Sequence, residues 1–208
     1  MAAPLTEWAD RIERVIAETP DCCVDRVVVI AETASTQDAA AAHAGGRPGL
    51  LVLTGRQTAG RGRMGRTWAD TADAGLAVTF ALPDDPRDPG ELAAVGGIAA
   101  RDALAAVAPG MTFRLKRPND VLAIDDVGNA RKIAGVLIER RDGLTLIGIG
   151  TNVAQDRWPD ELAESAVSLV QLGVGVDRIE LAAWLVRSMS AAVRLSPREI
   201  ASRWSASG

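Results

Sequence analysis

Residues 131–140, RKIAGVLIER, and residues 143–153, GLTLIGIGTNV, decide the fold. Each run has the length and the β-branched content of a strand, and Asp142-Gly143 between them is a common hairpin turn. The two runs therefore predict a pair of antiparallel strands. Three further strands are predicted by the apolar, β-branched runs upstream, at residues 25–32, 49–55 and 75–82.

The segments around these strands add hairpins and helices. Residues 111–124 predict a strand, a turn and a second strand, because Pro118-Asn119-Asp120 is typical turn sequence. Helical spacing and capping residues predict helices at residues 5–18, 35–44, 88–108 and 177–193, and a short last one through Trp204. This order favours an α+β fold, a mixed and largely antiparallel sheet backed by helices, over a doubly wound parallel sheet.

Length and composition predict one folded domain. The chain has 208 residues, of which 48% are apolar and 24% charged, as is usual for globular proteins. We expect an N-terminal helical segment at residues 1–25, a core at residues 26–172 and C-terminal helices at residues 173–208. Neither an internal repeat nor a low-complexity linker divides the chain.

The charge and the rare residue types exclude several functions. A net charge of −4 argues against a general nucleic-acid binder. Cys22 and Cys23 are adjacent, so no disulfide framework is expected, and His43 is the only histidine, which argues against zinc or histidine-based catalysis. No secretory signal or membrane span is visible. We therefore expect a cytoplasmic protein without nucleic-acid or membrane partners.

The segment 57–68, QTAGRGRMGRTW, is here named the Arg/Gly loop. It places Arg61, Arg63 and Arg66 among glycines that allow close backbone approach, which is typical of a cradle for phosphate or carboxylate oxygens. The alternative is an ordinary solvated loop. Trp68, which ends the loop, is interpreted either as a core residue or as a residue beside the ligand.

Other polar residues permit a structural and a functional interpretation. Ser35 and Thr36 precede a predicted helix and are suited to be N-caps, and Asn119-Asp120 is ordinary turn sequence. Asn152 could cap a strand end. Gly135 and Gly150 within predicted strands indicate a bulge or a close approach, which a ligand lying across the sheet would explain.

Four motifs follow one another along the chain: ETASTQ at 32–37, GRQTAGRGRMGRTW at 55–68, KRPNDV at 116–121, and RKIAGVLIE with GIGTNV between 131 and 153. Together they resemble the catalytic domain of biotin protein ligases, and the match covers most of residues 26–172. The resemblance implies a fold like that of class II aminoacyl-tRNA synthetases. It also implies formation of biotinyl-5′-AMP from biotin and Mg²⁺-bound ATP, and transfer of biotin to a lysine of a biotin carboxyl carrier domain.

The resemblance also implies roles for residues. Asp120 is expected to orient the attacking amine, and catalytic roles also fall to Arg63 and Lys132. The expected biotin-binding residues are Ser35, Thr36, Gln57, Arg61, Lys132, Gly135 and Gly150. The expected ATP-binding residues are Arg61, Arg63, Arg66, Trp68, Lys116, Asn119 and Asn152. No direct metal-ligand motif is present, so Mg²⁺ is expected to bind through the ATP phosphates.

The chain departs from the family pattern in places. Arg117 stands where the family has tryptophan, and Thr151 where an aliphatic residue is usual. We expect neither an N-terminal DNA-binding domain nor most of the C-terminal barrel. Without the DNA-binding domain, a repressor role is not expected. The alternatives are a lipoate or octanoate ligase or transferase, a noncatalytic biotin-binding module and, last, an RNA-binding protein. A monomer and a homodimer are both compatible with the sequence.

Overall fold

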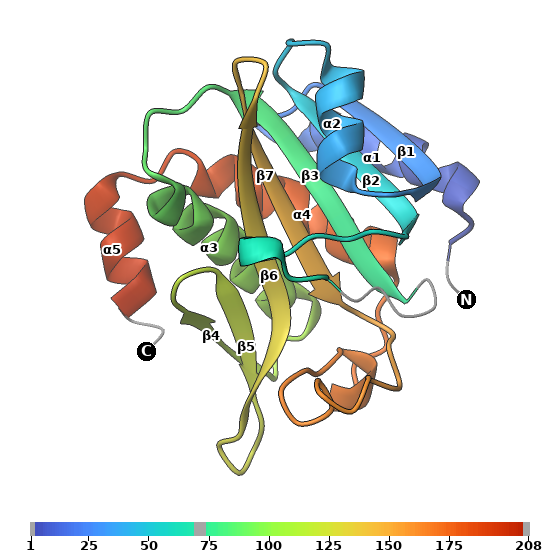
Figure 1. The fold of residues 1–208 in the computed structure, drawn as a ribbon, viewed down its shortest axis with the longest axis vertical. Helices are drawn as coiled ribbons and strands as arrows, with labels where there is room; N and C mark the ends of the chain where they lie inside the picture. The colour runs from blue at the N-terminus through green and yellow to red at the C-terminus, as the bar shows by residue number, and fades with distance from the viewer. Residues whose placement is uncertain (1–2, 69–73, 206–208) are drawn as a thin grey trace.

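The computed structural model describes residues 3–68 and 74–205. One seven-stranded sheet runs through it in the order β1-β2-β3-β7-β6-β5-β4 (Figure 1). The strands are β1 (Arg26–Thr33), β2 (Leu50–Gln57), β3 (Gly75–Pro83), β4 (Thr112–Lys116), β5 (Asp120–Ile124), β6 (Ala130–Arg141) and β7 (Leu144–Asn152). Among these seven strands of the described residues, only β1 and β2 pair in parallel, so the predicted mixed, largely antiparallel sheet is confirmed.

The predicted central hairpin is present. Strands β6 and β7 pair from Arg141 with Leu144 to Ala134 with Thr151. Asp142 and Gly143 between them have φ of 52° and 72°, the left-handed values that a tight hairpin turn requires at both central positions. The hairpin lies in the middle of the sheet, so its residues contact helices on one face and the candidate site on the other.

The helices also match the predicted ranges. They are α1 (Trp8–Glu18), α2 (Thr36–Ala44), α3 (Pro89–Val107), α4 (Arg178–Ala192) and α5 (Pro197–Ser205), with short 3-10 turns η1 (Leu5–Glu7), η2 (Arg63–Gly65) and η3 (Val170–Leu172). None of the helices in the described ranges combines the length and the apolar character needed to cross a bilayer.

Alternating residues of β2 show why the sheet is covered on both faces. Leu51 and Leu53 belong to the large core beneath α1, α3 and α4, whereas Leu50 and Val52 belong to a smaller cluster beneath α2. Figure 1 shows α2 on the near face and α4 on the far face. The short α2 packs on β1, β2, β3 and β7, and the near face of β6 is left to the Arg/Gly loop.

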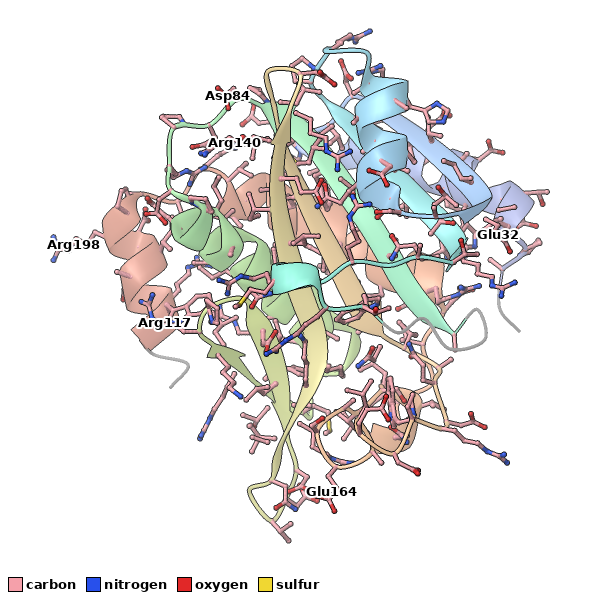
Figure 2. The ribbon with its side chains drawn as sticks, viewed as in Figure 1. Glu32, Asp84, Arg117, Arg140, Glu164 and Arg198 are labelled. Atoms are coloured by element: carbon pink, nitrogen blue, oxygen red, sulfur yellow. The ribbon has the colours of Figure 1, made fainter. Side chains whose placement is uncertain are left out.

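The last helix, α5, packs against Arg117, the residue that stands where the family has tryptophan. Its guanidinium stacks over the ring of Trp204 in α5, 5.4 Å from the centroid, and Figure 2 shows Arg117 beside the end of α5. Trp204 is itself buried and packs on Gly97 of α3. Arg203 and Asp102 add an ion pair between α5 and α3, with 3.2 Å between their charged atoms. The turn before Asn119 is therefore supported from below, although the family tryptophan is absent.

Candidate active site

Two adjoining hollows lie beside the Arg/Gly loop. The inner pocket, with about 440 Å³ of space between atoms, is lined by the start of α2, by the glycines of β6 and β7, and by Gln57 and Arg61. The outer hollow, with about 1,360 Å³, is lined by Arg66, Lys116, Asp120, Asn152, Trp158 and residues 162–166. Trp68 and Lys132 line both hollows and form the wall that they share.

The start of α2 places a chain of hydrogen bonds in the inner pocket. The hydroxyl of Thr79 donates to that of Thr36 (2.9 Å), which donates to Oε1 of Gln57 (3.0 Å), and the amide of Thr36 donates to the same oxygen (2.8 Å). All three residues are buried. Ser35 is the N-cap of α2, since its hydroxyl accepts from the amide of Gln37. The capping role predicted for Ser35 is confirmed, and the same turn lines the pocket.

Gln37 is a pocket residue that the sequence analysis did not select. Its Nε2 donates to the carbonyl of Leu137 (2.9 Å), while its buried Oε1 has no hydrogen-bond partner. Gly148 leaves the space for this side chain, because a Cβ there would lie 2.6 Å from Nε2. The motif ETASTQ includes Gln37, so its place at the pocket could have been inferred.

The strand glycines are explained by Trp68. Gly135 and Gly150 are paired across β6 and β7, and the indole of Trp68 stands over both. A Cβ on Gly150 would lie 2.5 Å from the indole, and one on Gly135 would lie 3.1 Å from it. The predicted close approach is confirmed, and in this structure a side chain of the loop makes it. Trp68 is half-buried and belongs to the site, not to the core.

The Arg/Gly loop has a defined shape. The amide of Trp68 donates to the carbonyl of Gly60 (2.9 Å), and the amide of Gly62 donates to that of Arg66 (2.7 Å). These bonds make a small antiparallel bridge that is closed by η2 at its tip. Figure 1 shows η2 in front of β6, so the loop crosses the uncovered part of the sheet.

Lys132 of the shared wall is paired with Asp120, which lines the outer hollow. Nζ of Lys132 is 2.6 Å from Oδ1 of Asp120 and 5.4 Å from the ring centroid of Trp68. The backbone of Lys132 is bonded to the segment 165–167, through Ser165 on one side and Val167 on the other. A lysine near the start of a strand is usually solvated, but this one is held by a carboxylate, an indole and its own backbone.

The two asparagines have structural partners. Nδ2 of Asn119 donates to the carbonyl of Val136 (2.7 Å), and Nη1 of Arg63 donates weakly to Oδ1 of Asn119 (3.4 Å). Nδ2 of Asn152 donates to the carbonyls of Lys132 (3.2 Å) and Val167 (3.1 Å). Asn152 therefore ties the end of β7 to β6, which is the strand-end alternative, while it also lines the outer hollow.

The three arginines of the loop differ in their surroundings. Arg61 forms ion pairs with Asp38 and Glu139, so its guanidinium faces carboxylates and not an open anion site. Arg63 and Arg66 are exposed, and Arg63 lines a separate hollow beside Pro118 and the start of α3. Strand alternation from Gly135 through Leu137 could have placed Glu139 on this face; its partners could not be read from spacing.

The described residues offer no protein cage for a metal ion. No group of three or more histidine, cysteine, aspartate or glutamate residues gathers within residues 3–68 and 74–205. Of the residues that line the outer hollow, Asp120 and Glu164 are the carboxylates, and Asp120 is paired with Lys132. These residues do not fit a directly ligated Mg²⁺, which would have to be held by phosphates.

The sequence of the chain is similar to those of known proteins. The model of the Biotin/lipoate A/B protein ligase family matches residues 29–156, more than half of the chain. The biotin-(acetyl-CoA-carboxylase) ligase of Mycobacterium tuberculosis is 39% identical over 175 residues, which cover 79% of this chain and 63% of that protein. The chain thus spans less than two thirds of that relative's length.

Solved structures of biotin protein ligases have a fold similar to that of this chain. A biotin protein ligase from Aquifex aeolicus in complex with biotin and ATP superposes with a TM-score of 0.69 at 30% identity, covering 81% of this chain and 70% of that one. The ligase from Leishmania major in complex with biotinyl-5-AMP gives 0.72 at 25% identity, covering 89% and 82%.

Proposed function

Because the chain belongs to the Biotin/lipoate A/B protein ligase family, we propose that it activates biotin with ATP and transfers the biotinyl group to a protein lysine. The observation that carries the proposal is the position of Lys132, which lies between two hollows of different chemistry and is paired with Asp120 of the outer one. Joining a carboxylate to a phosphate is favoured by two adjoining subsites, because they hold the reactants in contact, and by a cation where they meet, because it neutralises the growing negative charge.

The inner pocket suits the ring end of biotin. Its buried polar groups are neutral and already ordered by the chain from Thr79 through Thr36 to Gln57. Oε1 of Gln37 is an additional buried acceptor beside them. A ureido group carries both N–H donors and a carbonyl acceptor, so it matches a pocket of this kind. The carboxylate of biotin would then extend toward Lys132.

The outer hollow suits ATP. Arg66 and Lys116 are exposed cations on its rim, and Trp68 and Trp158 supply aromatic surface for a base. In the first step a carboxylate oxygen of biotin attacks the α-phosphorus, the bond to the bridging oxygen breaks, and pyrophosphate leaves with the electron pair. Negative charge grows on the α-phosphate, and Lys132 stands where it would be neutralised. We assign Arg63 to the same charge, since it is exposed beside Asn119.

The second step uses Asp120. The ε-amine of the acceptor lysine attacks the carbonyl carbon of biotinyl-5′-AMP, the bond from carbon to phosphate oxygen breaks, and AMP leaves. The amine must lose one proton, and the carboxylate of Asp120 lies next to Lys132 where it orients and receives that proton. The acceptor is proposed to be a biotin carboxyl carrier domain. Mg²⁺ would arrive bound to the phosphates of ATP.

The test is biotin-dependent exchange of labelled pyrophosphate into ATP by the purified chain, followed by transfer to an isolated carrier domain. We expect exchange that needs both biotin and ATP. Folded protein that binds biotin but exchanges nothing would be a binding module, and exchange that responds to lipoate in place of biotin would move the substrate to the other branch of the family. Either result would overturn the proposal.

A further inference from the structure

Four charged side chains form a closed ring above the inner pocket. Arg61 of the Arg/Gly loop binds Asp38 of α2 through two hydrogen bonds, at 2.6 and 3.0 Å, and contacts Glu139 of β6 at 3.1 Å. Arg141 of β6 closes the ring, at 2.6 Å from Asp38 and 2.6 Å from Glu139. Two arginines and two carboxylates alternate, so the ring has no net charge.

The ring joins three elements that surround the pocket. Asp38 lies in the first turn of α2, one residue after the pocket residue Gln37, and Glu139 lies on β6, four residues after Gly135. Arg61 itself lines the pocket. The only covalent route between these elements is long, because Arg61 is 23 residues from Asp38 and 78 from Glu139. The ring therefore ties the Arg/Gly loop to α2 and β6 next to the pocket, through side chains that are distant in sequence.

From this arrangement we infer that Asp38, Glu139 and Arg141 are positioning residues, which hold the Arg/Gly loop closed over bound biotin by gripping Arg61. The inference rests on the proposed function for the identity of the ligand. It also gives the arginines of the loop different roles. Arg61 holds the loop in place, whereas Arg63 and Arg66 bind phosphate.

The charges of the ring agree with a positioning role for Arg61. Arg61 and Arg141 hold the pKa of Asp38 down to about 2, and Asp38 together with Glu139 raises the pKa of Arg61. Asp38 and Arg61 therefore both stay charged at neutral pH. The side chains of Arg61, Arg141 and Asp38 remain 37%, 38% and 45% exposed. Half-exposed ion pairs are individually weak and screened by salt, so the loop can release to admit biotin and then close again.

The loop provides its own reporter. Trypsin cleaves after arginine, and Arg63 and Arg66 lie at the exposed tip of the loop beyond Arg61. With the ligand-free chain and limiting trypsin, intact-mass analysis would give the rate of cleavage at these two positions. We expect Asp38→Asn to raise it about three- to tenfold, and Arg141→Gln about two- to fivefold. Salt at about 0.5 M should accelerate cleavage in the wild type and change little in Asp38→Asn.

Two further variants separate positioning from folding. Asp25 is a carboxylate that also pairs with two arginines, Arg26 and Arg47, at the far end of β1. Asp25→Asn should leave cleavage of the loop at the wild-type rate. Arg141→Gln lies on β6, so it keeps the test valid if Asp38→Asn weakens α2. Asp38→Glu retains the charge and should restore most of the protection.

The enzymatic readout is the split between KM and kcat. In pyrophosphate exchange, Asp38→Asn and Arg141→Gln should raise KM for biotin about three- to tenfold, with kcat within about twofold of the wild type. A loss of kcat with unchanged KM would overturn the inference, and so would loop cleavage at wild-type rates in both variants. Because proteolysis needs no ligand, it decides the role of the ring even if the chain exchanges no pyrophosphate, in which case only the proposed function fails.

Discussion

The inner pocket and the outer hollow share a wall, yet they are built in opposite ways. In the inner pocket, Thr36 and Gln57 are buried, neutral and bonded to each other before any ligand arrives. In the outer hollow, the side chains of Lys116 and Arg66 are exposed and have no partner within the described residues. Preformed neutral contacts suit a small uncharged ring system, whereas free cations suit a polyanion that brings its own charge.

Removal of the shared cation should have the largest effect, because it acts on both hollows at once. Lys132→Gln takes the ammonium away from the point where the two substrates meet and leaves Asp120 unpaired. We expect kcat/KM for pyrophosphate exchange to fall by about 10³-fold or more, which corresponds to about 4 kcal/mol of transition-state stabilisation.

The chain supplies a matched control for Lys132, since it contains only two lysines and both line the outer hollow. Lys116→Gln removes the same charge from the rim and should cost less than about tenfold. Comparable losses in the two variants would mean that the wall is not the reacting centre.

Damage to the inner pocket should weaken one substrate only. Thr36→Val deletes the hydroxyl that joins Thr79 to Gln57 and leaves buried groups without their partner. Calorimetry should show the Kd for biotin rising about 10- to 100-fold, or about 1–3 kcal/mol, with the Kd for ATP unchanged. Thr145→Val is the control, because Thr145 is equally buried and bonded but lies at the far end of β7. If Thr36→Val also bound ATP more weakly, the two hollows would not act as separate subsites.

The outer hollow can be examined by chemical labelling, again because only Lys116 and Lys132 carry ε-amines. Lys116 is exposed and should be acetylated readily by a soluble reagent, with ATP slowing the reaction about fivefold and biotin leaving it unchanged. Peptide mapping by mass spectrometry would measure each lysine separately. Protection of Lys116 by biotin alone would place the ligands the other way round.

The elements of this fold could be predicted because their signals are local. The runs 131–140 and 143–153 contain both the strand pattern and the turn, and the structure confirms the hairpin. The strand order could not be predicted in the same way. The parallel pairing of β1 with β2 and the place of β7 between β3 and β6 depend on packing between segments distant in sequence.

The candidate site shows the same division. Motifs selected residues such as Ser35, Gln57 and Lys132, which the structure brings to adjoining hollows. Spacing could not reveal that the guanidinium of Arg61 is bound by Asp38 and Glu139, since an ion pair depends on which distant side chains share a face. The roles in binding and catalysis stay predictions until ligands are measured.

The smallest expected effect concerns the ring of Arg61, Asp38, Glu139 and Arg141 at the inner pocket, and it depends on pH. Asp38 has a folded pKa of about 2 against its ordinary 3.8, chiefly because Arg61 donates to it. A depressed carboxyl pKa adds stability that is complete above about pH 4.5 and is lost as the pH falls toward 2. Because the side chain of Asp38 is about half exposed and solvent screens its charge, its share at neutral pH is a few tenths to about 1 kcal/mol.

Urea unfolding of wild type and Asp38→Asn between pH 7 and pH 3 would measure this share directly. The difference in unfolding free energy should be constant from pH 7 to about pH 4.5 and shrink below it, because protonated aspartate and asparagine are both neutral. A difference that stays constant down to pH 3 would show that Asp38 stabilises α2 as a neutral cap and not Arg61 as a charge. The ion-pair ring would then not be held by charge, and it would not differ in this way from the preformed inner pocket.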